Sequence, residues 1–188
     1  MSTPQIRRKT RADAERNRDR VLEAARTMFA ASGYDVQMSE VARAAGVGVG
    51  TLYRKFPTRE ALIEAIAEQR TVEIAGTARH FVEADDSGRA GLAGFLHHVG
   101  EVLAEDRGMS EVIEKAMGSN EPRGQTHAAL LASMEELIDR ARVHGAVGQD
   151  VTTGDIDMVI CGLAAVIRNA AGDWRRYIEI ALEGLRAR

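Results

Sequence analysis

The stretch "AAGVGVGTLYRKFPTREAL" (residues 44–62) decides how this sequence is to be interpreted. It places glycines at the alternate positions 46, 48 and 50 and follows them with polar and basic residues. Two local structures use glycines in this way. A glycine-rich loop can wrap the phosphate of a nucleotide, and a tight turn can join two short helices, the second of which lies against DNA.

The nucleotide-binding alternative fails on context and on spacing. A dinucleotide fingerprint needs a hydrophobic strand before its glycines, but the preceding "MSEVARAAG" has the spacing of a helix. The fingerprint also needs its third glycine one position later, where this chain has Thr51. No Gly-Lys-Ser or Gly-Lys-Thr follows, so the Walker pattern is missing as well. The stretch therefore predicts a helix-turn-helix.

Each residue of the stretch fits that second interpretation. Gly46 supplies the positive φ that a tight turn needs, and Gly48 stands where the following helix is capped. Leu52 and Phe56 are four residues apart and form one buried face of a helix over residues 49–56. The same spacing turns four residues outward, namely Val49, Gly50, Tyr53 and Arg54, with Thr51 and Lys55 at the flanks.

The rest of the chain also shows helical periodicity, and no segment has convincing strand alternation. Asn17 is expected to cap a helix that ends at Gly33. In the second half, Gly108 and Gly145 are expected to end helices, and Thr152 with Asp155 predicts a capping box. We therefore expect an all-α protein of about nine helices.

The charge of the chain is unevenly distributed. The formal net charge is −3, but residues 1–60 hold 12 Lys or Arg against 7 Asp or Glu, and the remainder holds 13 against 21. A basic first third joined to an acidic remainder predicts that the first third meets a polyanion and that the remainder does not.

The segment "GVGVGTLYRKFPTREALIEAI" resembles the recognition-helix signature of the TetR family of bacterial transcriptional regulators. "RVLEAARTMFAASGY" is similar to that family's first helix, and "MSEVARAAGV" to its second. The resemblance implies a homodimeric, cytoplasmic repressor of a palindromic operator, released by a small-molecule effector. It also implies three parts: a basic flexible arm (1–16), a three-helix DNA-binding domain (17–66), and a helical effector-binding and dimerisation domain (67–188).

By position in the motif, the resemblance implies a set of DNA-binding residues. Expected phosphate contacts are Thr51, Tyr53, Lys55 and Arg59, and expected base contacts are Val49, Gly50 and Arg54. Ser39 and Arg43 of the preceding helix are expected near the DNA backbone or the groove edge, and Gly48 also belongs to the expected DNA-binding set. Two features depart from the family pattern: Gly48 stands where Ser or Thr is commoner, and "YDVQM" is one residue shorter than usual.

The second half offers candidates of a weaker kind. Met109, Met117 and Met134 with Phe95 could line an adaptable effector pocket, although each could equally be plain core. The last two helices are candidates for a dimer interface or for packing within the chain, and the candidate interface residues are Ile160, Leu163, Trp174, Tyr177 and Ile178.

Several classes of function find no support in the sequence. The histidines and the single Cys161 show no metal-ligand spacing, and no nucleophile and base can be paired, so we expect no metal, no cofactor and no enzyme. The longest apolar run, residues 158–167, is about half of what a membrane span needs. Two alternatives to a ligand-responsive regulator stay open: an architectural DNA-binding protein without an effector, and an all-α protein that binds or converts a small molecule.

Overall fold

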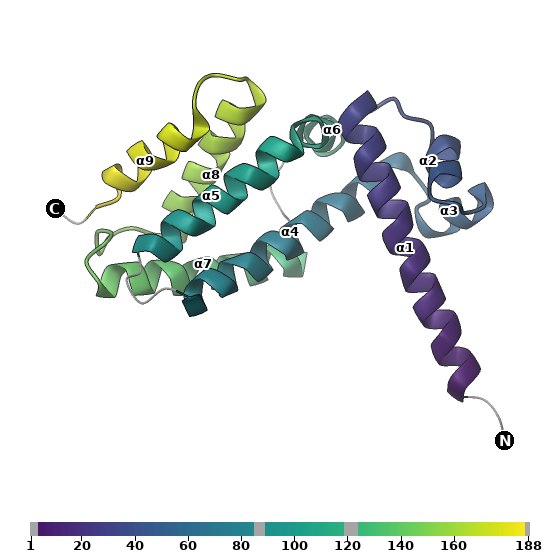
Figure 1. Ribbon diagram of the computed structural model, residues 1–188, viewed down its shortest axis with the longest axis horizontal. Coiled ribbons are helices and arrows are strands. Elements are labelled where there is room, and N and C mark those ends of the chain that lie inside the picture. Colours follow the sequence, from purple (N-terminus) through teal and green to yellow (C-terminus); the bar gives the residue numbers. More distant parts are fainter. Residues whose placement is uncertain (1–3, 85–88, 119–123, 187–188) are drawn as a thin grey trace. The chain divides into compact units, whose positions relative to one another are not determined.

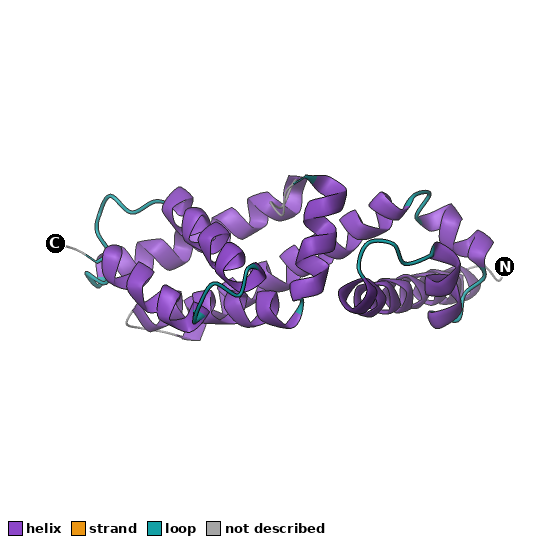
Figure 2. Cartoon of the chain, turned by 90° about the horizontal axis from the view of Figure 1, so that it is seen from above, coloured by secondary structure: helices purple, strands orange, loops and turns teal. Residues whose placement is uncertain are grey.

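The computed structural model describes residues 4–84, 89–118 and 124–186, and within these ranges the chain is helical and contains no strand (Figures 1 and 2). The expected all-α fold is confirmed. The helices are α1 (Pro4–Ser32), α2 (Met38–Ala44), α3 (Val49–Lys55), α4 (Arg59–Ala84), α5 (Arg89–Glu105), α6 (Arg107–Met117), α7 (Gly124–Val143), α8 (Thr153–Arg168) and α9 (Trp174–Gly184).

The chain forms two compact units, and α4 and α6 each continue from one into the other. The first unit comprises Met1–Ala67 and Gly108–Asn120, and the second comprises Glu68–Arg107 and Glu121–Arg188. From the sequence, residues 108–120 were expected in the C-terminal domain. They join the first unit because α6 buries Met109, Val112 and Ile113 in its hydrophobic core.

The first helix begins earlier than the sequence predicts. Residues 1–3 of the expected arm lie outside the described residues, and from Pro4 onward the chain is helical. Asn17 lies inside this helix, where its side chain accepts a hydrogen bond from Arg20 at 2.7 Å. The prediction that Asn17 caps the helix is therefore wrong. The Ala, Arg and Glu residues that precede it are strong helix formers, so the sequence contains nothing that stops the helix there.

The core of the second unit is built around α5, which contacts α7, α8 and α9. Phe95, Leu96 and Val99 of α5 are buried, as are Leu163 of α8 and Ile178 of α9. The expected capping box begins α8: the backbone N–H of Thr152 donates to Asp155 Oδ2 at 2.7 Å, and the N–H of Asp155 donates to the Thr152 hydroxyl at 3.3 Å. Arg89 of α5 pairs with Glu183 of α9 at 2.9 Å.

Glycines end helices at two of the predicted positions and not at a third. Gly33 and Gly145 follow α1 and α7 with φ of 76° and 64°, as expected of left-handed residues that end a helix. Gly108 was also expected to end a helix, and this prediction is wrong. It lies in the first turn of α6, where a Cβ would collide with the backbone carbonyl of Ala30.

Candidate nucleic-acid interface

The turn between α2 and α3 is as tight as the sequence predicts. Gly46 has φ of 66°, and its N–H bonds to the carbonyl of Arg43 at 3.1 Å. The N–H of Val47 reaches back to the carbonyl of Ala42 at 2.9 Å, which satisfies a carbonyl at the end of α2. Ala42 is fully buried, so the two helices can approach closely. Gly48 is the N-cap residue of α3.

The buried face of α3 determines which side chains it presents outward. Leu52 is buried in the core of the first unit, and Phe56, which ends the helix, is buried beside it. Because residues four apart share a helix face, the opposite side is exposed. Val49 and Tyr53 lie on this side and are 42% and 46% exposed.

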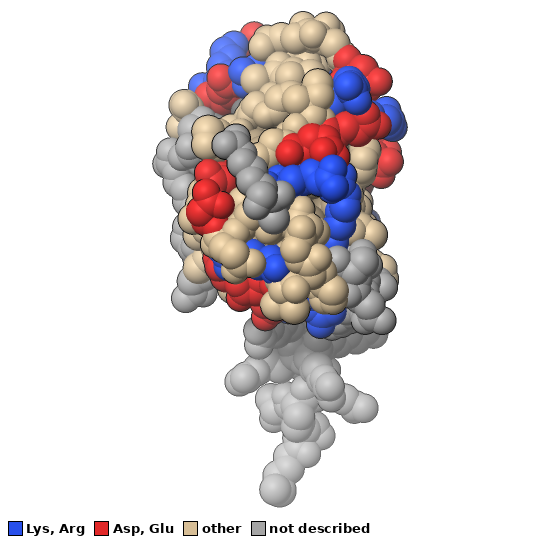
Figure 3. Space-filling model, turned by 90° about the vertical axis from the view of Figure 1, so that its left-hand side faces the viewer, with Lys and Arg blue, Asp and Glu red and all other residues tan. Residues whose placement is uncertain are grey.

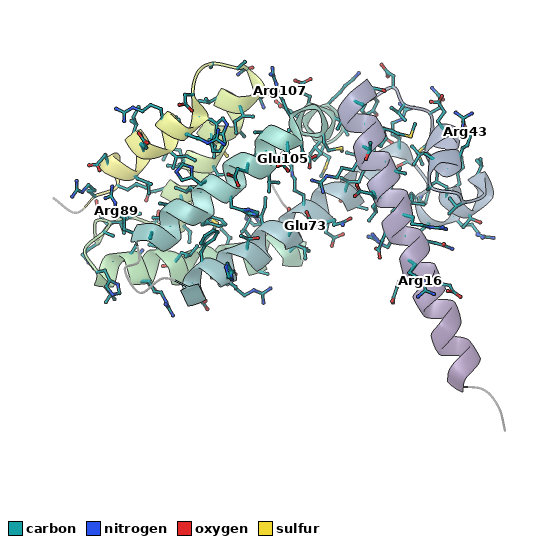
Figure 4. All side chains as sticks on the ribbon, viewed as in Figure 1. Arg16, Arg43, Glu73, Arg89, Glu105 and Arg107 are labelled. Atoms are coloured by element: carbon teal, nitrogen blue, oxygen red, sulfur yellow. The ribbon has the colours of Figure 1, made fainter. Side chains whose placement is uncertain are left out.

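The other residues predicted on and around this face are exposed as well. They come from α2 and α3 and are Ser39, Arg43, Gly50, Thr51, Arg54 and Lys55. Arg54 donates a hydrogen bond from Nη2 to the Thr51 hydroxyl at 3.1 Å, which orients its guanidinium along the helix. Figure 4 shows Arg43 extending outward from α2. The structure thus brings these residues together on two adjacent helices, while their contact with DNA stays a prediction.

Gly50 lies on this exposed face and has no intramolecular reason to be glycine. It is inside α3, has no positive φ, and no neighbouring heavy atom of the described chain comes within 4 Å of a Cβ placed on it. Glycine in a helix costs stability relative to alanine. A side chain is therefore missing at a position where the protein itself would accept one.

Arg59, the remaining predicted phosphate contact, is half-buried in the first turn of α4. Its guanidinium carbon lies 5.0 Å from the centre of the Tyr34 ring, and Lys115 Nζ of α6 lies 4.7 Å from the same centre. The Tyr34 hydroxyl donates a hydrogen bond to Glu60 Oε1. This bond stabilises both the neutral phenol and the ionised carboxylate, so it raises the pKa of Tyr34 and lowers the pKa of Glu60.

One contact near the recognition helix was not foreseen from the sequence. The guanidinium carbon of Arg18, on α1, lies 5.7 Å from the centre of the Phe56 ring at the end of α3. This is a cation–π distance that ties the basic part of α1 to the end of the recognition helix. Residues far apart in sequence make this contact, so no local pattern could have revealed it.

Comparison with known proteins agrees with this geometry. Residues 21–66 match the family described as bacterial regulatory proteins, tetR family, and residues 87–187 match the SbtR-like transcriptional regulator C-terminal domain. The chain is a member of the TetR family of transcriptional regulators. Similar proteins are named as transcriptional regulators and not as enzymes, which confirms the prediction of a DNA-binding regulator.

Several relatives of this TetR-family regulator have known structures. A TetR transcription regulatory protein from Mycobacterium vanbaalenii is 36% identical, covers 95% of this chain and 99% of its own, and has a TM-score of 0.69. A TetR regulator from Streptomyces coelicolor is 27% identical, covers 90% and 98%, and has a TM-score of 0.67. RolR in complex with resorcinol shares the fold, with 23% identity, coverage of 94% and 91%, and a TM-score of 0.68.

Curated sequence relatives match this TetR-family regulator over a shorter part. An HTH-type transcriptional regulator from Staphylococcus aureus is 35% identical over 82 residues, which is 42% of this chain and 39% of that protein. The chain therefore spans well under half of the length of this curated relative.

The four candidate pocket residues of this TetR-family regulator do not form one group. Phe95 and Met134 are buried in the core of the second unit. Met109 is buried in the core of the first unit, and Met117 packs against that same core. The two methionines of α6 belong to the first unit, and the pocket itself stays a prediction.

The candidate dimer residues of this regulator are also mostly internal. Leu163 and Ile178 are fully buried, and Ile160 is half-buried against the same core. Trp174 lies over Gly100 of α5, and Tyr177 lies over Gly162 of α8 with its hydroxyl donating to the Val159 carbonyl at 3.3 Å. The small residues of α5 and α8 make room for these rings, so the aromatic side chains pack within the unit.

The residues that α8 and α9 do expose were not foreseen. Met158 of α8 is 66% exposed and Ile180 of α9 is 58% exposed, and the two helices contact each other. A helical-wheel comparison of the two helices could have separated them from their buried neighbours. In the face drawn in Figure 3, acidic and basic side chains lie side by side.

Across the described ranges, no three or more His, Cys, Asp or Glu residues gather in a way that could hold a metal ion. Every helix in the same ranges is too short or too polar to cross a bilayer.

Proposed function

We propose that this TetR-family regulator is a homodimeric repressor that binds a palindromic operator through α3 and leaves it when a small molecule binds. The observation that carries the proposal is the exposed face of α3. It holds Val49 and Tyr53, both poorly suited to water, around a glycine that the protein's own packing does not require. Such a face suits close approach to a DNA groove.

The side chains of this face divide into two roles. Arg54 has the planar fork that binds guanine O6 and N7, and Val49 can contact a thymine methyl group. Thr51, Tyr53 and Lys55 flank them and suit phosphate oxygens, as does Arg59 in the first turn of α4. Ser39 and Arg43 of α2 extend the same surface. The hydrogen bond from Arg54 to Thr51 orients the guanidinium before DNA is present.

The proposed dimer uses α8 and α9. Met158 of α8 and Ile180 of α9 are exposed apolar residues on two helices that contact each other, and apolar side chains of this kind suit a protein interface. A two-fold dimer presents two recognition helices related by symmetry, so its operator is palindromic. The proposed effector site lies in the second unit, where the core includes Phe95 and Met134. RolR, which shares the fold, was solved with resorcinol bound.

The decisive experiment is fluorescence anisotropy with DNA flanking the protein's own gene, compared with random duplex DNA. We expect Tyr53→Ala to weaken binding to both DNAs. Arg54→Ala should in addition remove about 1–3 kcal/mol of preference at one base position. Arg79→Ala is the charge-matched control, because it removes one exposed cation from the second unit.

Three outcomes would contradict parts of the proposal. Equal affinity of the native protein for both DNAs would instead indicate an architectural DNA-binding protein. Loss of the same size from Arg79→Ala and Arg54→Ala would show a general charge effect rather than base recognition. A monomer in solution would contradict the proposed dimer and, with it, the expectation that the operator is palindromic.

A further inference from the structure

Tyr34 is the centre of a cluster formed by three segments of the first unit. It lies between α1 and α2, and its ring has Arg59 of α4 at 5.0 Å and Lys115 of α6 at 4.7 Å from its centre. Both distances are within the roughly 6 Å over which a cation is attracted to an aromatic face. The Tyr34 ring thus lies within cation–π distance of two cations, Arg59 and Lys115, from helices that are far apart in sequence.

The orientation of the Tyr34 ring is held by Glu60. The phenol hydroxyl donates to Glu60 Oε1, and Glu60 follows Arg59 directly in the first turn of α4. The rise in the pKa of Tyr34, caused mainly by this bond, keeps the phenol protonated and donating. The residue that fixes the Tyr34 ring, Glu60, and the residue that carries the guanidinium, Arg59, therefore both belong to the first turn of α4.

The guanidinium of Arg59 packs against this ring. Arg59 is half-buried, and its Nε is buried without a hydrogen-bond partner among the described residues. The Tyr34 side chain, with its ring centre 5.0 Å from the guanidinium carbon, and the carboxylate of Glu60, which attracts the Arg59 cation, are neighbours of this guanidinium. A long side chain that is ordered before binding loses less conformational freedom when it meets a phosphate.

We propose that Tyr34 is a positioning residue that holds Arg59 ready for its phosphate contact. This inference rests on the proposed role of Arg59 in DNA binding. Lys115 shares the ring but is exposed and lies on α6, so it brings a second cation to the same cluster without replacing Arg59. Tyr34 itself does not contact the DNA in this proposal and acts through Arg59.

A double-mutant cycle on a random-sequence duplex at low salt tests the proposal, because phosphate contacts do not depend on sequence. Tyr34→Leu should weaken binding about two- to fivefold, the size expected from an exposed cation–π contact. In an Arg59→Ala background it should have no further effect. In a Lys115→Gln background it should keep its full effect. Tyr34→Phe retains the ring and should bind better than Tyr34→Leu.

The outcomes separate this proposal from the proposed function. If Arg59→Ala leaves both the affinity and the salt dependence unchanged, the phosphate role of Arg59 and the positioning role of Tyr34 are both wrong. If Arg59→Ala weakens binding but Tyr34→Leu costs the same factor with or without Arg59, only the positioning role is wrong. Circular dichroism of each variant shows whether the helices are intact, and Tyr34→Phe tests the proposal even if Tyr34→Leu unfolds.

Discussion

Gly108 of α6 lies directly against the backbone carbonyl of Ala30 in the last turn of α1, so closely that a Cβ on Gly108 would collide with it. This close approach, between positions more than seventy residues apart, lets α6 bury Met109, Val112 and Ile113 in the core of the first unit. Helix α6, which follows α5 in the chain, thus completes the DNA-binding unit. We expect the stability of this unit to depend on Gly108, which the local sequence alone predicts to end a helix.

We expect Gly108→Ala to destabilise the first unit. The added methyl group must displace backbone, and overpacking of this kind costs about 1–3 kcal/mol. Urea unfolding followed by circular dichroism measures the change. Gly76→Ala is the matched control, since Gly76 also lies within a helix but has open space around it, and it should stabilise by up to about 1 kcal/mol. A stable Gly108→Ala protein would contradict the close packing of α6 on α1.

Gly50→Ala should separate stability from DNA binding. Alanine fits the free space around Gly50 and improves helix propensity, so the unfolding midpoint should stay the same or rise, by up to about 1 kcal/mol. The added methyl group should nevertheless weaken binding to the DNA flanking the gene, because α3 could no longer approach the groove as closely. Anisotropy titration measures this effect, with Gly76→Ala again as the control. If Gly50→Ala binds DNA as well as the native protein does, the proposal that Gly50 lets α3 approach the groove closely is wrong.

Acid should weaken the start of α8 through Asp155. Hydrogen bonds from the Thr152 hydroxyl and then its backbone N–H lower the pKa of Asp155 below its usual value. A carboxylate with a lowered folded pKa stabilises the protein above its unfolded pKa of about 3.9, and this contribution is lost as the pH falls through the folded pKa.

The difference in thermal midpoint between the native protein and Asp155→Asn should therefore be largest near neutral pH and shrink below about pH 4. Asp157→Asn is the matched control, because it removes a neighbouring carboxylate of α8 that lies outside the capping box. A difference that is constant with pH would mean that the ionised carboxylate of Asp155 does not stabilise α8.

Met158→Glu should break the proposed dimer. The substitution places a charge on a surface that dimerisation would bury, and an unpaired buried charge is strongly unfavourable. Light scattering at micromolar concentration should show the native protein as a dimer and the variant as a monomer. Val143→Glu is the control, because Val143 is 82% exposed and apolar but lies at the end of α7. If Met158→Glu stays dimeric, the dimer uses another surface.

Local sequence was enough to predict the helix-turn-helix. Gly46, Leu52 and Phe56 act through contacts within a few residues, and the positive φ and the buried face follow from their chemistry alone. The same is true of the capping box at Thr152 and Asp155, which closes within one helical turn. The exposed face of α3 was therefore predictable, and so was the family.

Contacts between distant segments decided the rest. The sequence marks Met109 and Met117 as apolar but cannot say which core they enter, and it marks Trp174 and Tyr177 as interface residue types although glycines of α5 and α8 receive their rings. Tyr34, Arg59 and Lys115 carry no shared local signal and meet only when α4 and α6 pack in the first unit. Hydrophobic periodicity specifies that a face is buried, whereas tertiary packing chooses its partner.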